Sequence, residues 1–298
     1  MKFVAEGTFT ALVTPMADDA ARSVDVAGLQ RLVEQQIAGD ITGLVACGTT
    51  GETSTLSEAE YELVVSKTIE FARGRVPVIV GSGSNSTQKT IATSKKAEQL
   101  GADAILVVTP YYNKPTQAGL IAHYLAVADS VQVPVILYNV PGRTGCNLLP
   151  ATVAELAKHP RIVALKEAAG SLDQVIDTLT RVPTDFSLLS GEDSLCVPTY
   201  AVGGKGVISV VSNVAPAQTA ALYRDFVAGR TKQAAAGQLA LHRLIRTLFS
   251  EPNPQPAKMA MHLLGLMQPV LRLPMTQASD AIAAQLTSDL KSLGLLPN

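Results

Sequence analysis

Short apolar runs rich in β-branched residues recur along the chain, and longer segments with a helical spacing of apolar residues separate them. Most of the short runs are continuous hydrophobic stretches rather than strict alternations of apolar and polar residues. This pattern is typical of strands buried on both faces, as in a parallel sheet. We therefore predict eight parallel strands, at residues 9–14, 43–47, 76–80, 104–109, 133–139, 162–167, 186–190 and 206–211.

Helical signals are clearest in four of the intervening segments, at residues 26–38, 57–73, 87–100 and 117–129. Ser57, followed by Glu58 and Glu60, is a favourable helix start because serine caps free backbone N–H groups and acidic residues suit the first turn. Eight strand–helix units at fairly even spacing predict an α/β fold, the closed TIM (β/α)8 barrel. A doubly wound open sheet is the alternative, but TALVTP stands where that fold would place GxGxxG.

The pattern changes after the eighth predicted strand. From about residue 215 onward the chain is helical in pattern and rich in Ala, Leu and Gln, with one interruption at EPNPQPAK. The three prolines of that stretch must break any helix there. We predict a catalytic barrel domain at residues 1–228 and a C-terminal helical domain at residues 229–298 that packs on the barrel.

Composition narrows the class of protein. The chain has 298 residues, 47% hydrophobic and 16% charged, and a net charge of -1 gives no reason to expect a nucleic-acid or membrane partner. The three cysteines and four histidines are scattered without metal-ligand spacing, so we expect neither a metal site nor a disulfide framework. The N-terminal segment lacks the unbroken apolar run of a signal peptide, and no stretch approaches the roughly 20 apolar residues of a membrane span. We therefore expect a cytoplasmic protein.

The most unusual strand-end residue is Lys166, which follows four apolar residues in IVALKEA. Active sites of TIM barrels lie at the carboxyl ends of the strands. With a side-chain period of two, Lys166 should share a face with Ala164 and Ile162. A lysine whose stem reaches out to solvent is the structural alternative. A buried lysine in its neutral form can react with a keto acid to form a Schiff base, and the iminium is an electron sink that needs no metal or cofactor.

Other strand ends supply polar groups that suit this chemistry, although each has a structural alternative. Thr49 and Thr50 lie between glycines, where hydroxyls and backbone amides can bind a carboxylate, or simply form a turn of small residues. Tyr138 on the fifth strand can transfer protons to the forming intermediate, or only pack. Arg143 follows in a Pro-Gly loop and has the fork geometry for a carboxylate, or is a solvated loop residue.

Two adjacent tyrosines, Tyr111 and Tyr112, follow the fourth strand in VTPYYNKP. If the chain is extended there, they point to opposite sides, so we expect only one of them to serve the core of its own subunit. Polar groups thus gather at the same end of strands two, four, five and six. Their convergence favours a Schiff-base enzyme over a barrel with a structural lysine.

Nine motifs occur along the chain in a recognisable order: TALVTP, GTTGE, VTPYYNKP, YNVPGRTG, IVALKEA, LLSGED, GGKGVISV, EPNPQPAK and LRLPM. Their order and approximate spacing resemble those of the dihydrodipicolinate synthase family over essentially the whole chain. GTTGE, YNVP and the strand-six lysine are shared with the wider superfamily of class I pyruvate aldolases, which includes N-acetylneuraminate lyase. Arg143 is the narrower signal, since the sugar-acid lyases usually lack an arginine there.

The resemblance implies a lyase that condenses pyruvate with L-aspartate-4-semialdehyde to 4-hydroxy-tetrahydrodipicolinate, in diaminopimelate and lysine biosynthesis. It implies that Lys166 forms the Schiff base with pyruvate and that Tyr138 donates and accepts protons. The further residues that it implies are Thr49 and Tyr112 in a proton relay with Tyr138, Thr50 and Ile208 in contact with pyruvate, and Arg143 on the semialdehyde carboxylate.

The resemblance also implies a homo-oligomer. The family's equivalent of Tyr112 reaches the neighbouring subunit's site, so a tight dimer is the expected catalytic unit, usually within a tetramer built as a dimer of dimers. The alternative function is another pyruvate-dependent class I aldolase that cleaves a sugar acid, against which Arg143 argues. A non-catalytic barrel is opposed by the filled strand-end positions, and a metal-dependent aldolase by the lack of ligands at those positions.

Some family members are inhibited by lysine bound at the dimer interface. This chain keeps the expected asparagine and tyrosine of that site, Asn85 and Tyr111, but has Glu58 and Tyr61 at the histidine positions and Lys89 where a glutamate is expected. The glutamate would pair with the ligand's ammonium, so a lysine there replaces attraction with repulsion. Feedback inhibition by L-lysine is therefore expected to be weak or absent.

Overall fold

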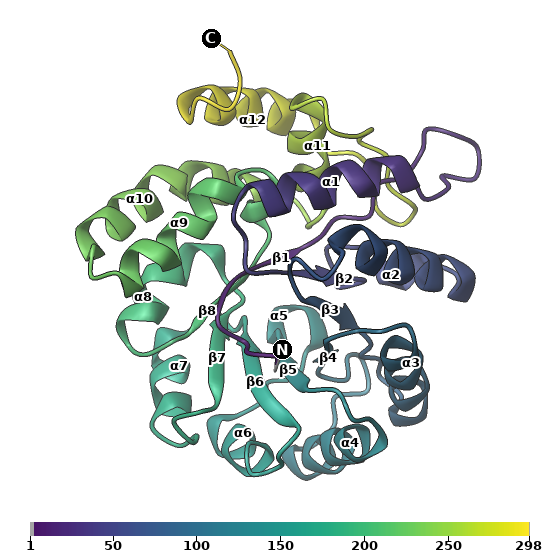
Figure 1. The fold of residues 1–298 in the computed structure, drawn as a ribbon, viewed down its shortest axis with the longest axis vertical. Helices are drawn as coiled ribbons and strands as arrows, with labels where there is room; N and C mark the ends of the chain where they lie inside the picture. The colour runs from purple at the N-terminus through teal and green to yellow at the C-terminus, as the bar shows by residue number, and fades with distance from the viewer. Residues whose placement is uncertain (1–2, 298) are drawn as a thin grey trace.

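Eight parallel strands form a closed barrel in the computed structural model, which describes residues 3–297 (Figure 1). Each strand pairs with the next one along the chain, and β8 pairs with β1, as in a TIM barrel. The predicted fold class is confirmed. The strands are β1 (Gly7–Ala11), β2 (Gly43–Ala46), β3 (Val78–Gly81), β4 (Ala104–Val108), β5 (Val135–Asn139), β6 (Ile162–Glu167), β7 (Ser187–Ser190) and β8 (Gly206–Ser209).

Apolar side chains cover both faces of the barrel wall. An interior cluster contains strand residues such as Phe9, Val45 and Ile136, which are all fully buried. A larger cluster fills the space between the strands and the surrounding helices. Because both faces of the strands contact apolar neighbours, the strands are continuous hydrophobic runs in the sequence.

Helices enclose the barrel from the outside. α1 (Val26–Ala38) has the predicted bounds, and α2 (Glu58–Ala72) starts at the predicted signal, where Ser57 and Glu60 form a capping box. None of the helices within residues 3–297 is long and apolar enough to cross a membrane. The other barrel helices are α3 (Thr87–Gln99), α4 (Gln117–Ser130), α5 (Pro141–Thr144), α6 (Pro150–Leu156), α7 (Leu172–Leu179), α8 (Cys196–Ala201) and α9 (Pro216–Val227).

The first strand ends earlier than its apolar pattern suggests. β1 ends at Ala11, although the prediction extended it to residue 14. The backbone N–H of Val13 donates to the side-chain oxygen of Asn213 at 3.1 Å instead of to a neighbouring strand. A long-range side-chain contact thus ends the strand inside an apolar run.

The faces of β6 also differ from the expectation. Ile162 and Ala164 lie opposite consecutive residues of β5, so the pairing skips Val163. Such an extra residue is a bulge, and it changes the face to which the preceding residues point. Ala164 belongs to the interior cluster, whereas Ile162 packs in the outer one, so the prediction that Lys166 shares a face with Ile162 is wrong.

Three helices follow the barrel and lie together beside it, with α10 next to α9 (Figure 1). The predicted boundary after residue 228 falls in the turn between α9 and α10, and the division into two domains remains our proposal. The first four residues of EPNPQPAK lie between α10 and α11, and the last four begin α11, with Pro256 in its first turn. The three helices are α10 (Thr231–Leu248), α11 (Gln255–Leu263) and α12 (Asp280–Ser292).

Candidate active site

Lys166 lies at the carboxyl end of β6, with only 6% of its surface exposed. It is opposite Tyr138 in the pairing of β6 with β5, and its Nζ atom lies 4.3 Å from the centre of the tyrosine ring. Tyr138 and the fully buried Ile208 both belong to the interior cluster. Within residues 3–297, Lys166 forms no ion pair or hydrogen bond through its amine. Its amine is therefore available for covalent chemistry.

The loop after β7 lies directly against this lysine. A Cβ atom at Gly191 would lie 2.6 Å from Ala168 Cβ and 3.1 Å from Lys166 Cε, so a larger residue would displace one of them. The Gly191 N–H donates to the carbonyl oxygen of Glu167 at 2.6 Å. The backbone thus holds the lysine stem closely while leaving its amine unpaired.

A buried polar network behind the lysine joins β5 to β6. Asn139 Nδ2 donates to both carboxylate oxygens of Glu167 at 3.1 Å, and Gln174 Nε2 donates to the same carboxylate at 3.0 Å. Burial raises the pKa of Glu167, and these hydrogen bonds oppose the rise. Because Asn139 follows Tyr138 and Glu167 follows Lys166, the network keeps the two predicted catalytic side chains in register. Nothing in the sequence pattern alone indicated this pairing.

A buried acid links the ends of β7 and β8. Asp193 is 1% exposed, and its Oδ2 accepts hydrogen bonds from the backbone N–H groups of Val210 at 2.9 Å and Val211 at 3.1 Å. Burial raises the pKa values of Asp193 and of neighbouring Glu192. The positive charge of Lys166 opposes this rise, because it stabilises both carboxylates. The loop that packs on the lysine is therefore fixed to the strand that carries Ile208.

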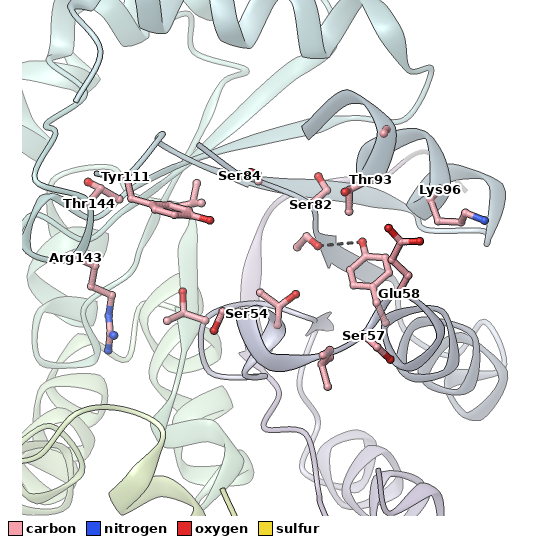
Figure 2. Close-up of a pocket in the computed structure, with 18 of the residues that line it drawn as sticks. Ser54, Ser57, Glu58, Ser82, Ser84, Thr93, Lys96, Tyr111, Arg143 and Thr144 are labelled. Carbon is pink, nitrogen blue, oxygen red and sulfur yellow. Dashed lines mark hydrogen bonds between the residues drawn. The ribbon is translucent and has the colours of Figure 1, made fainter. Parts of the chain in front are cut away.

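A cavity of about 600 Å³ opens next to the carboxyl ends of β2, β3, β4 and β5 (Figure 2). Thr49 and Arg143 line it, and Tyr111 extends its ring across it. Much of its remaining wall comes from α2 and α3, whereas Lys166 and Tyr138 are not among its lining residues. The cavity therefore adjoins the predicted site and shares only its outer residues.

The two threonines of GTTGE and the loop arginine lie around this opening. Thr49 is partly buried, whereas Thr50 is 3% exposed and its Oγ1 accepts a hydrogen bond from Asn253 Nδ2 at 2.9 Å. Arg143 is exposed, and its Nη2 donates to the Asn253 carbonyl oxygen at 3.4 Å. Asn253 was not predicted as a site residue, because nothing in EPNPQPAK indicates which of its residues reaches the barrel loops.

Tyr112 is not brought to the site by its own chain. It is 87% exposed and has a φ of +73°, which bulky residues rarely adopt. The chain is therefore not extended here, and Tyr111 is 40% exposed as well. The expectation that one of the two tyrosines serves the core of its own subunit is wrong, because the turn places both at the surface.

A second buried lysine lies on α11, and the sequence pattern did not indicate it. Lys258 is fully buried, forms an ion pair with Glu52 and donates to the carbonyl oxygen of Val270 at 2.8 Å. Burial lowers the pKa of Lys258, and the Glu52 carboxylate opposes this shift. Glu52 ends the GTTGE motif, so the pair fixes the C-terminal segment to the loop that carries the two threonines.

These groups define a class of protein. A TIM barrel carries a buried, unpaired lysine beside a tyrosine at the carboxyl ends of its strands, with two hydroxyls and an arginine nearby. This set can form and protonate a Schiff base and bind carboxylates. No group of three His, Cys, Asp or Glu side chains within residues 3–297 could hold a metal ion. The class is that of lysine-dependent aldolase-type enzymes.

Comparisons with known proteins identify the family. Residues 4–293 match the model of the dihydrodipicolinate synthetase family. Proteins named 4-hydroxy-tetrahydrodipicolinate synthase are similar over the full length: that of Geotalea daltonii is 48% identical, covering 98% of this chain and 99% of the relative, and that of Methylococcus capsulatus is 46% identical with the same coverage. This chain belongs to the dihydrodipicolinate synthetase family, as its motifs predicted.

Solved structures agree with this assignment. The crystal structure of dihydrodipicolinate synthase from Thermotoga maritima has a TM-score of 0.96 and 42% identity, covering 99% of this chain and 100% of that one. The chloride-inhibited enzyme from Acinetobacter baumannii, solved in complex with pyruvate, has a TM-score of 0.95 and 40% identity, covering 98% and 99%. The predicted fold and enzyme class are both confirmed at full length.

Proposed function

We propose that this chain condenses pyruvate with L-aspartate-4-semialdehyde to 4-hydroxy-tetrahydrodipicolinate through a Schiff base on Lys166. The observation that carries the proposal is the buried, unpaired amine of Lys166, 4.3 Å from the Tyr138 ring, in a chain that matches this family over residues 4–293. A relative that was solved in complex with pyruvate supports the choice of keto acid.

The chemistry begins with attack of the Lys166 amine on the keto carbon of pyruvate. Tyr138 transfers protons as the carbinolamine forms and loses water, which leaves an iminium. The iminium withdraws electrons, so the neighbouring methyl carbon loses a proton, and the resulting enamine attacks the aldehyde carbon of the semialdehyde. The semialdehyde's own amino group then displaces the lysine to close the ring and free the enzyme.

The remaining predicted residues hold the two substrates. Thr50 donates a hydrogen bond to the pyruvate carboxylate, and Ile208 supplies an apolar wall in the interior cluster. Thr49, at the edge of the cavity, belongs to the proton relay with Tyr138. Arg143, exposed at the same opening, binds the carboxylate of the semialdehyde as it arrives.

Tyr112 completes the relay in a neighbouring subunit of a dimer, and two such dimers form a tetramer. Its 87% exposure and its φ of +73° support this role, because strained and exposed aromatic residues are typical of functional contacts. We place the enzyme in the cytoplasm, where a reducing compartment suits its three free cysteines.

Borohydride reduction in the presence of pyruvate tests the proposal. Mass spectrometry of the digested protein is expected to find the reduced adduct on Lys166. Lys205 and Lys258 are internal controls: Lys205 donates to the carbonyl oxygen of Thr184 at 2.7 Å before β8 begins, and Lys258 is paired with Glu52. Adduct formation at full yield in a Lys166→Ala variant would show that the assignment is wrong.

A further inference from the structure

One residue of the C-terminal segment contacts two of the proposed substrate-binding residues at once. Asn253 lies between α10 and α11 and is 5% exposed. Its side-chain Nδ2 donates to Thr50 Oγ1 at 2.9 Å, and its backbone carbonyl oxygen accepts from Arg143 Nη2 at 3.4 Å. Thr50 follows β2 and Arg143 follows β5, so Asn253 joins two loops of the barrel.

The bond to Thr50 determines what the threonine hydroxyl can do. A hydroxyl has one hydrogen to donate and two lone pairs that accept. Asn253 Nδ2 is a donor, so it occupies a lone pair of Thr50 Oγ1 and leaves the hydroxyl hydrogen directed elsewhere. A hydroxyl held in this way presents its hydrogen to an anionic group, such as a carboxylate.

We propose that Asn253 is a positioning residue that sets Thr50 as a hydrogen-bond donor to the pyruvate carboxylate. The inference rests on the proposed function and assigns a catalytic consequence to the C-terminal segment. Its side chain acts on the pyruvate site through Thr50, whereas its contact with Arg143 uses only the backbone. Substitution of the side chain should therefore affect pyruvate and spare the semialdehyde.

Two further contacts keep Asn253 and Thr50 in place. Glu52, two residues after Thr50, pairs with the buried Lys258 of α11, and its Oε2 accepts from the backbone N–H of Arg272 at 3.4 Å. Glu52 itself has a φ of +53°, so the loop turns sharply where the C-terminal segment holds it. The donor and the hydroxyl thus belong to two segments that are fixed to each other beside the hydrogen bond.

An isosteric substitution tests the direction of the hydrogen bond. Asn253→Asp replaces the amide donor with acceptors, so Thr50 would donate to Asp instead of to pyruvate. We expect the KM for pyruvate to rise about tenfold or more, while the KM for the semialdehyde changes less than about twofold. Asn253→Ala removes the donor without adding charge, and the same pattern is expected of it with a smaller rise. The alanine variant keeps the test intact if the aspartate variant does not fold.

A double-mutant cycle separates positioning from general damage. If Asn253 acts through Thr50, then Asn253→Ala in a Thr50→Val background should add less than about twofold to the KM for pyruvate. An unchanged KM in both Asn253 variants, an equal rise for both substrates, or independent effects in the cycle would overturn the inference. Trapping of pyruvate on Lys166 of the wild-type protein is run alongside, because its absence would overturn the proposed function instead.

Discussion

Two lysines are buried among residues 3–297, in two regions of the molecule, and they differ in what surrounds the amine. Lys258 on α11 is fully buried, and its ammonium contacts the Glu52 carboxylate and the Val270 carbonyl oxygen. Lys166 at the end of β6 is 6% exposed, and its amine faces the Tyr138 ring with no ion pair or hydrogen bond among residues 3–297. The two lysines are thus buried to a similar extent, but only Lys258 forms an ion pair.

The difference shows that a buried lysine does not necessarily have an unoccupied amine. At Lys258 the carboxylate compensates the ammonium, so the charge is stabilised and the amine is occupied. At Lys166 the protein fixes the stem through the Gly191 loop, and the nearby Glu192 and Asp193 carboxylates form no ion pair with the amine, which leaves it unoccupied. We therefore expect Lys258 to contribute to stability and Lys166 to contribute to activity.

Replacing Lys166 by Met should have the largest effect on the reaction. The covalent route is lost, so we expect kcat/KM to fall on the order of 10³-fold or more, equivalent to about 4 kcal/mol of barrier. The free energy of unfolding should stay the same or rise, because no ion pair is broken and an apolar side chain enters the barrel interior. Steady-state kinetics measure kcat/KM, and urea unfolding measures the stability. A large loss of stability would mean that Lys166, like Lys258, has a structural role.

Replacing Lys258 by Met should instead destabilise the protein. The substitution leaves the Glu52 carboxylate buried without its partner, which typically costs about 3–5 kcal/mol. Urea unfolding at a fixed protein concentration measures the loss. The matched control is Lys258→Met with Glu52→Gln, which removes both charges and should recover much of the lost stability. A single variant as stable as the wild type would mean that the pair is not structural.

Arg143 extends the comparison to a cation at the surface. Arg143→Ala should leave the pyruvate adduct on Lys166 intact and raise the KM for the semialdehyde. A charge-assisted hydrogen bond of about 1.5–3 kcal/mol corresponds to a rise of roughly 10- to 150-fold. Kinetics with each substrate varied in turn provide the measurement, and a parallel assay with a sugar acid tests the alternative aldolase. If kcat/KM for the semialdehyde did not change, the assignment of the second substrate would fail.

Lys89 is an exposed cation that belongs to none of the proposed catalytic or substrate-binding residues. We therefore expect its substitution to have the smallest effect, confined to inhibition by L-lysine. It is exposed on α3, while Glu58, Tyr61 and Tyr111 line the nearby cavity. Two like charges about 4 Å apart cost roughly 1 kcal/mol in water, which is enough to weaken the binding of a lysine ligand. We expect little inhibition by L-lysine and a gain of sensitivity in Lys89→Glu. The reaction rate measured across a range of L-lysine concentrations tests this prediction. Clear inhibition of the wild type at sub-millimolar L-lysine would contradict it.

The sequence predicted the elements best where apolar periodicity is local. The range 162–167 agrees with β6 at both ends, as does 26–38 with α1, and Ser57 caps α2 as expected. The errors lie where a distant contact overrides the pattern. Asn213 ends β1 early, and the bulge in β6 moves Ile162 to the outer cluster.

In the proposed site, too, the sequence predicted the local features and not the distant contacts. Lys166 and Tyr138 could be selected from the sequence because each closes an apolar strand, and parallel strands in a barrel end at one rim. Tyr112 could be named but not placed, since its positive φ turns the chain away from the extended path that the sequence suggested. The hydrogen bond between Asn139 and Glu167 could not be predicted, because the local sequence does not show which neighbouring strand a buried acid contacts.

The sequence by itself determined that this chain forms a barrel and that one lysine ends an apolar strand, because both follow from side-chain periodicity over a few residues. Only the tertiary structure decided which buried lysine is paired and which is free. It also brought Asn253 to Thr50, although 203 positions separate them. Such contacts depend on how the closed barrel and the C-terminal helices pack together, and local hydrophobic patterns carry no information about that packing.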